Sequence, residues 1–178
     1  PEKAEGANNI VIVGGGVVGC ETAHWLANEY GKNVTVLEML PHFMMGVCTA
    51  NRGHLLHYLE KSGVRLYNCT KVKALAKDGV YVEQNQSQTV PDPYNTWQPL
   101  LPPNIPNPME KAIKEEIVEK KIPADLIVLA MGGKADETFF FEAGEEHLAK
   151  EIYNIGDSSR AGRVLEAVRG AYHLAVRI

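Results

Sequence analysis

A run of glycines between a β-branched apolar segment and a helix-like segment constrains the fold of this chain most. Residues 9–13 read Asn-Ile-Val-Ile-Val, a pattern typical of a strand buried on both faces of a parallel sheet. Residues 17–30 carry apolar side chains near helical spacing, and Gly31 stands where a helix C-cap is expected. Residues 33–38 give a second strand. This order predicts two parallel strands joined by a right-handed helical crossover.

The alternation of helix-like and strand-like segments continues along the chain. Residues 51–62 predict a second helix, residues 64–67 a third parallel strand, and the apolar residues 126–130 a fourth. Residues 70–76 and 79–83 lie on either side of an Asp-Gly pair, which is a strong hairpin signal. The sequence therefore predicts an α/β fold of three layers, with a parallel sheet in the order 3-2-1-4 and an antiparallel meander.

Four other segments carry less regular patterns. Residues 84–108 contain seven prolines and predict a long excursion that folds back on its own domain, with docking on another domain as the alternative. Residues 111–121 are charged and predict a helix. Residues 151–155 predict a last strand that pairs with the sheet edge beside the fourth strand, and residues 164–178 predict a terminal helix.

The glycine run satisfies the G-x-G-x-x-G motif in the context that a Rossmann unit requires, after a buried strand and before a helix. Its first glycine allows a tight turn, its second lets the backbone approach a pyrophosphate, and its third lets helix and strand pack closely. The helix N-terminus adds N–H groups and a positive dipole end. The expected pyrophosphate contacts are Gly14, Gly15, Gly16, Val17, Val18 and Gly19.

A carboxylate closes the second strand at Glu38, within the spacing of about 20 residues that this motif expects. It is placed to accept hydrogen bonds from the adenosine ribose, and it would repel a 2'-phosphate. No arginine follows in residues 39–42 to attract a 2'-phosphate, so NADH is favoured over NADPH. Met39, next to Glu38, is expected to be a further contact of the cofactor. FAD or another adenine nucleotide in the same loop stays open on these residues alone.

Composition and charge exclude several other classes. The net charge of -4, without a basic run, makes nucleic acid an unexpected partner. No apolar stretch approaches the roughly 20 residues that span a bilayer, so we expect no membrane contact and a cytoplasmic protein. The three cysteines are too far apart for a CxxC pair or a cluster site. Without an initiator methionine, the chain is expected to be an excised fragment; a homo-oligomer stays open.

A few polar residues have alternative interpretations. Cys20 is expected to be buried packing rather than a thiol whose pKa is depressed by the helix N-terminus. No further ligand joins His42, His54 and His57 at ligand spacing, so a solvent-facing surface is favoured over a metal site. Arg52 faces either the phosphates or a carboxylate. No side chain is a convincing general acid, so we assign no catalytic residue.

Four segments resemble the pyridine-nucleotide-disulfide-oxidoreductase superfamily, and within it the NADH:flavin oxidoreductases of the 2,4-dienoyl-CoA reductase and 2-enoate reductase type. They are residues 14–23, 34–41, 124–132 and 152–157. The resemblance implies that residues 1–150 form an NAD(P)H-binding domain, with Ala130, Met131 and Gly132 at the cofactor. Residues 151–178 would be the returning end of an FAD-binding domain.

The same resemblance implies cofactors and partners. Asp157, which follows Gly156, would hydrogen-bond the FAD ribityl chain, and the parent enzyme would carry FMN and an iron–sulfur cluster on a preceding barrel. Hydride would pass from NADH to FAD, and electrons onward to a C=C bond of an enoate or enoyl thioester. The expected partners are a dinucleotide and the parent's flavin domains, and the fragment alone would be inactive. The alternatives are a non-catalytic nucleotide-binding interaction module and a stand-alone FAD-binding domain.

Overall fold

A computed structural model describes residues 2–97, 101, 105, 107–108 and 111–178, so part of the predicted Pro-rich excursion lies outside the described residues. The chain divides into two compact units, Pro1–Met131 and Gly132–Ile178. Within the described ranges, no helix is both long enough and apolar enough to cross a membrane.

The first unit is built on a four-stranded parallel sheet in the order β3-β2-β1-β7, which confirms the predicted order 3-2-1-4. Its strands are β1 Asn9–Val13, β2 Asn33–Leu37, β3 Arg65–Tyr67 and β7 Leu126–Leu129. β1 and β2 pair in register up to Val13 and Leu37. Both strands therefore end at the same edge, where the glycine loop and Glu38 follow.

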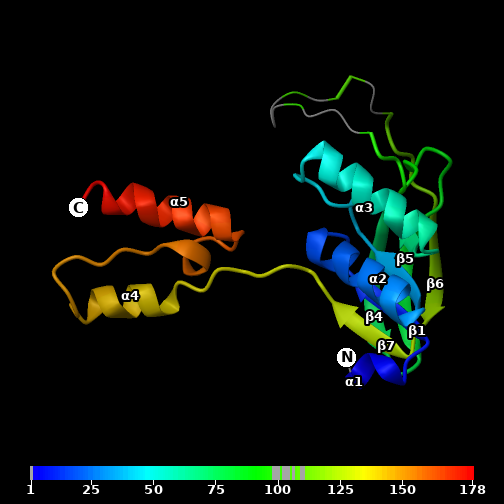
Figure 1. The fold of residues 1–178 in the computed structure, drawn as a ribbon, viewed down its shortest axis with the longest axis horizontal. Coiled ribbons are helices and arrows are strands. Elements are labelled where there is room, and N and C mark those ends of the chain that lie inside the picture. Colours follow the sequence, from blue (N-terminus) through cyan, green and yellow to red (C-terminus); the bar gives the residue numbers. More distant parts are fainter. Residues whose placement is uncertain (1, 98–100, 102–104, 106, 109–110) are drawn as a thin grey trace. The chain divides into compact units, whose positions relative to one another are not determined.

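Helices cover one face of this sheet, as Figure 1 shows for α2 and α3, which lie side by side. The helices of this unit are α1 Glu2–Glu5, α2 Val17–Tyr30 and α3 Thr49–Lys61. Alternate residues of β1 and β2 pack against Leu26 of α2 and against Leu56 and Leu59 of α3. Because these side chains are at most 3% exposed, this layer supplies much of the apolar core.

A three-stranded antiparallel sheet covers the opposite face, in the order β4-β5-β6. Its strands are β4 Thr70–Ala76, β5 Gly79–Asn85 and β6 Ile117–Pro123. The other set of alternating residues in β1 and β2 packs on Val80, Val82 and Ile122 of this sheet. The unit therefore has the predicted three layers: helices, parallel sheet and antiparallel meander.

The predicted helix over residues 111–121 is wrong. Residues 111–116 have no regular structure, and β6 pairs with β5 from Ile117, opposite Asn85, to Pro123, opposite Gly79. Glu and Lys favour helix, but β6 is a sheet edge whose outer face meets solvent, so charged residues suit it as well. Burial of Ile122 against the parallel sheet outweighs local propensity here.

The described start of the excursion folds back on its own unit, as predicted. The Tyr94 ring packs against the helix-side core. Its hydroxyl donates to the carbonyl oxygen of Val64 over 2.5 Å and accepts from Leu66 N over 3.3 Å.

The second unit contains α4 Thr138–Glu145, the 3-10 turn η1 Gly156–Ser158 and α5 Val164–Ala175. The terminal helix is therefore confirmed, but the predicted strand over residues 151–155 is wrong. Residues 152–155 have no regular structure. A strand requires a neighbouring strand whose main chain it can pair with. The hydrogen bond within this segment is between side chains, where the Tyr153 hydroxyl donates to the Glu151 carboxylate over 3.0 Å.

Candidate functional site

The glycine loop joins the end of β1 to the start of α2. Gly14 has φ +111, which side chains rarely tolerate, and a Cβ there would collide with the carbonyl oxygen of Ala130. A Cβ on Gly19 would collide with the carbonyl oxygen of Gly14. Because the opposing atoms belong to the main chain, they cannot move aside easily. The fold itself therefore requires glycine at positions 14 and 19.

Gly16 differs from these two glycines. Its φ of -71 suits any residue, and a Cβ there would meet no atom within 4 Å. It is the N-cap of α2, without a side-chain cap, and the helix has no acidic residue in its first turn. The first helical bond is from Cys20 N to Gly16 O, over 3.0 Å, so the preceding N–H groups have no acceptor within the helix. This helix end is an open anion-binding surface beside a glycine that packing does not explain.

Glu38 lies next to that surface, immediately after β2. Its Oε2 accepts from Gly15 N and its Oε1 from Leu40 N, each over 2.8 Å. The carboxylate is thereby fixed in one orientation at the tip of the strand. Each oxygen keeps further acceptor capacity. The side chain can accept hydrogen bonds from hydroxyl groups and repels a phosphate placed against it.

The other predicted contacts of the first unit lie at the same sheet edge. Ala130 N donates to Val13 O over 2.8 Å, which places the end of β7 beside the glycine loop. Met39 and Met131 are 67% and 68% exposed. With β2 on one side of β1 and β7 on the other, this is the switch point at which open α/β sheets bind ligands. Gly132, with φ +80, begins the second unit.

Cys20 lies under the loop and is fully buried. Its thiol donates to Gly15 O over 3.5 Å. Burial raises its pKa to about 12, and the Glu38 carboxylate adds to the rise. Of the two interpretations of Cys20, buried packing is confirmed, and a pKa depressed by the helix N-terminus is wrong because desolvation dominates.

Alkylation of the native chain at pH 8 should separate the cysteines. Cys48 is exposed and should react with iodoacetamide, whereas Cys20 should stay unmodified. With a pKa of about 12, roughly one Cys20 thiol in ten thousand is ionised at that pH, and burial blocks access as well. Peptide mass spectrometry gives the modified fraction at each position. The urea-unfolded chain is the control and should label fully; native labelling of Cys20 at the rate of Cys48 would contradict the assignment.

Among the residues that the structure describes, Arg52 pairs with no carboxylate, so that interpretation is wrong, and its contact with phosphates stays a prediction. It is only 3% exposed. Its Nε donates to Phe43 O over 2.9 Å and a terminal nitrogen donates to Asn95 O over 3.0 Å. Position 52 lies on the inner side of α3, where main-chain carbonyls of two loops converge.

Of the three histidines considered for a metal, His54 and His57 lie on α3, whereas His42 lies in the loop before it. His54 and His57 are exposed on α3 and have their rings 4.7 and 5.7 Å from that of Tyr58. Within the part of the chain that the structure describes, no group of three His, Cys, Asp or Glu side chains could hold a metal ion.

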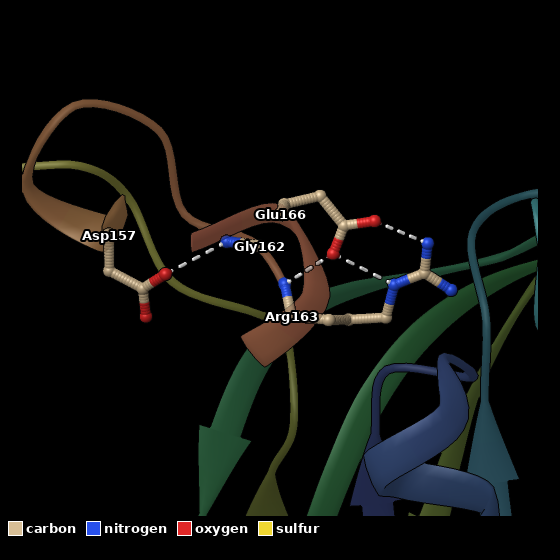
Figure 2. Close-up of polar contacts among 4 residues, drawn as sticks. All are labelled: Asp157, Gly162, Arg163 and Glu166. Carbon is tan, nitrogen blue, oxygen red and sulfur yellow. Dashed lines mark hydrogen bonds and ion pairs between the residues drawn. The ribbon is translucent and has the colours of Figure 1, made fainter. Parts of the chain in front are cut away.

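In the second unit, Gly156 and Asp157 form the turn η1 before α5. Gly156 has φ +67, and Asp157 Oδ1 accepts from Gly162 N over 3.2 Å. Figure 2 shows this bond next to the pair of Arg163 and Glu166, which caps α5. Arg163 NH2 lies 2.6 Å from Glu166 Oε1, and this hydrogen bond lowers the pKa of Glu166 to about 2.

A cavity of about 630 Å³ opens beside this turn. Its lining comes from residues 154–156, residues 159–163 and the first turns of α5. Its size is that of a small-molecule site. Yet among the described residues of the second unit, Ala143 is the one apolar residue that is buried, so little hydrophobic core supports the walls of the cavity.

Sequence reasoning missed three residues that shape the first site. Phe43 is fully buried beside Gly15, Met44 N donates to Gly15 O over 2.8 Å, and Asn68 is 4% exposed. An aromatic residue five positions after Glu38 was the available signal, but no motif links it to the glycine loop.

Comparisons with known proteins agree with this geometry. In sequence, the chain is 27% identical over 169 residues to an NADH oxidase of Thermoanaerobacter brockii, covering 95% of this chain and 21% of that protein. It is 22% identical over 180 residues to a cinnamate reductase of Clostridium sporogenes, covering 99% and 22%. The chain therefore spans about a fifth of the length of these curated relatives.

Solved structures show the same fold. A 2-naphthoyl-CoA reductase complex matches with a TM-score of 0.68 and 24% identity, covering 96% of this chain and 21% of that one. Histamine dehydrogenase from Rhizobium sp. 4-9 matches with a TM-score of 0.70 and 15% identity, covering 100% and 23%. A family model described as pyridine nucleotide-disulphide oxidoreductase matches residues 1–162, nearly the whole chain. The chain therefore belongs to the pyridine nucleotide-disulphide oxidoreductase family.

Proposed function

We propose that this chain is the NADH-binding domain of a flavin-dependent oxidoreductase of the NADH:flavin type, followed by the end of its FAD-binding domain. Residues 1–150 are the nucleotide domain and residues 151–178 the FAD-domain segment; this functional boundary lies inside the second compact unit. The observation that carries the proposal is Gly16: its Cβ space is empty, and it lies at the uncapped N-terminus of α2. A ligand's pyrophosphate explains both features.

The chain's own residues bind and orient the nucleotide. The loop of residues 14–19 holds the pyrophosphate, with Gly16 allowing close approach. Gly14 N and Gly15 N already donate to Leu37 O and to Glu38, so the donors to the phosphates are N–H groups of residues 16–19. Glu38 accepts from the ribose hydroxyls and, with Met39 beside it, disfavours the 2'-phosphate of NADPH. Residues 130–132 flank the far half of the dinucleotide. In the second unit, Gly156 and Asp157 would contact FAD once the rest of its domain is present.

NADH supplies a hydride when bound, which in the parent enzyme would pass to FAD, with FMN and an iron–sulfur cluster as onward carriers. The onward acceptor we propose is the C=C bond of an enoate or enoyl thioester. A cinnamate reductase and a naphthoyl-CoA reductase among the similar proteins support this class. The partners are the parent's flavin domains, and the fragment alone is inactive. A cytoplasmic location and the oligomeric state stay predictions.

Calorimetric titration of the purified chain with NADH, NADPH and FAD, each alone, tests this function. We expect a colourless protein that binds NADH in preference to NADPH. FAD should bind weakly, because the second unit has little buried apolar surface to hold it. A yellow protein that is indifferent to NADH would move the glycine loop to FAD and reject the proposal.

Glu38→Gln should reduce the discrimination between NADH and NADPH. The amide keeps the size of the side chain and one acceptor oxygen, but it removes the charge that opposes a 2'-phosphate. Loss of that repulsion should narrow the ratio of the two dissociation constants by about tenfold, equivalent to about 1.4 kcal/mol. The control is Glu29→Gln, an exposed carboxylate on α2, which should leave the ratio unchanged. An unaltered ratio in Glu38→Gln would remove Glu38 from the ribose site.

A further inference from the structure

The loop of residues 39–48, between β2 and α3, closes over the glycine loop. Met44 N donates to Gly15 O over 2.8 Å. The Phe43 ring fills the space beside Gly15, where a Cβ would lie 2.6 Å from Phe43 Cε1. Gly15 N donates to Glu38. Both main-chain polar groups of Gly15 are therefore fixed by neighbours, and its position depends on that of the loop.

Arg52 connects this loop to residues 86–97, the described part of the excursion that follows the end of β5 at Asn85. One donor reaches Phe43 O over 2.9 Å and another reaches Asn95 O over 3.0 Å. Burial lowers the pKa of Arg52, because removing the cation from water disfavours its charged form. A buried guanidinium whose recorded acceptors are main-chain carbonyls fixes the backbone of both segments at once.

Asn68 makes the same kind of bridge at a second point. It follows β3 and is 4% exposed. Its Nδ2 donates to Pro41 O, in the loop of residues 39–48, over 2.7 Å and to Pro91 O, in residues 86–97, over 2.8 Å. Two buried polar side chains from different elements thus bridge the same pair of segments.

Residues 86–97 are themselves anchored. The Tyr94 hydroxyl accepts a hydrogen bond from Leu66 N of β3 and donates one to the carbonyl oxygen of Val64, just before that strand. Thr96 lies against α3: a Cβ on Gly53 would be 3.4 Å from Thr96 Cβ. The segment is therefore a fixed support for the loop rather than a solvated linker.

We propose that Arg52 and Asn68 are positioning residues that brace the loop of residues 39–48 against residues 86–97 and so hold Gly15 and Glu38 in the geometry that binds NADH. The proposal rests on the proposed function. Holding a binding loop in its bound conformation before the ligand arrives removes the entropy cost of ordering it. Residues 86–97 are then a part of the nucleotide site that acts without touching the nucleotide.

Substitution of Arg52 in the full chain tests the brace. Arg52→Met removes both bonds, and NADH should bind about tenfold more weakly, measured by NADH fluorescence at a temperature where circular dichroism shows the fold intact. Arg65→Met is the matched control, because Arg65 is exposed on β3. The affinity of this variant for NADH should equal that of the wild-type chain. Arg52→Lys keeps a buried donor and should recover part of the lost affinity, which a simple loss of core packing does not predict.

Removal of the support gives a second, independent test. Lys114 N donates to Thr89 Oγ1 over 2.7 Å, so a short Gly-Ser turn can replace residues 90–113. The shortened chain should also bind NADH about tenfold more weakly. Arg52→Met should then cause little further loss, because Asn95 is already absent and the bond to Phe43 O alone no longer ties the loop to a support.

The outcomes separate the two proposals. A wild-type chain that fails to bind NADH rejects the proposed function before any variant is compared. A wild-type chain that binds NADH, with unchanged affinity in folded Arg52→Met or in the shortened chain, rejects the brace and leaves the function standing. If Arg52→Met does not fold, Asn68→Ser and the shortened chain decide in the same way.

Discussion

Gly16→Ser should weaken NADH binding strongly and leave the fold as stable as before, or slightly more stable. Serine is a good N-cap residue, and its hydroxyl can accept from the open N–H groups of α2, which is worth a few tenths of a kcal/mol relative to glycine. The space for its Cβ is empty in the protein alone. In the proposed complex, the pyrophosphate of NADH would occupy the same space. The dissociation constant should rise about a hundredfold, by calorimetry, while the urea midpoint stays or rises.

General damage to the fold would lower both NADH affinity and stability, so weaker binding without loss of stability points to the ligand site itself. Gly6→Ser is the matched control, since a Cβ on Gly6 also meets no atom within 4 Å, and Gly6 precedes the start of β1 whereas the glycine loop follows its end. It should change neither quantity. Gly19→Ala gives the contrasting case: its Cβ collides with main chain, so stability should fall together with binding. Full NADH affinity in Gly16→Ser would show that no pyrophosphate approaches this position.

The parallel sheet could be predicted because its signals are local and consistent. β1 and β2 are continuous apolar runs, as strands buried on both faces must be, and each helix between strands ends near a glycine. The crossover rule then fixes the order around β1. The glycine loop and Glu38 follow at the sheet edge for the same reason, so both were found from spacing alone.

The two incorrect segments failed because tertiary pairing decides them. In residues 111–121, the helix-favouring Glu and Lys residues conceal an edge strand whose partner, β5, is more than 30 residues away in sequence. Residues 151–155 look like a strand, but a strand exists only with a neighbour, and the described part of their unit offers helices and a turn.

The contacts of Arg52 and Asn68 that brace the loop of residues 39–48 could not be predicted from the sequence. Arg52 and Asn68 each bond to main-chain carbonyls, which every residue carries, so no residue type marks the partner positions. The apolar side chains of Trp97, Leu100, Leu101 and Ile105 predict that the excursion packs on something. Trp97, Leu101 and Ile105 are 57%, 38% and 49% exposed, and Leu100 lies outside the described residues. The contact with the core is made instead by Tyr94, which that prediction did not name.

Phe43→Ala should lower the free energy of unfolding by about 3–5 kcal/mol, the usual cost of truncating a fully buried phenylalanine. Phe43 is 0% exposed and lies in the helix-side core, with Met44 next to it at 2%. The cavity would open directly beside Gly15, so part of the loss would appear as movement of the glycine loop. Urea unfolding followed by circular dichroism measures the change.

Phe139→Ala is the control for this substitution, because Phe139 is 76% exposed on α4 and its truncation should change the unfolding free energy by less than about 0.5 kcal/mol. If Phe43 supports the nucleotide site, NADH added to Phe43→Ala should recover less stability than in the wild-type chain, because the weakened site binds it less tightly. Equal stabilisation by NADH in both chains would mean that Phe43 fills the core without positioning Gly15. The two readouts together distinguish a residue that only packs from one that also shapes the site.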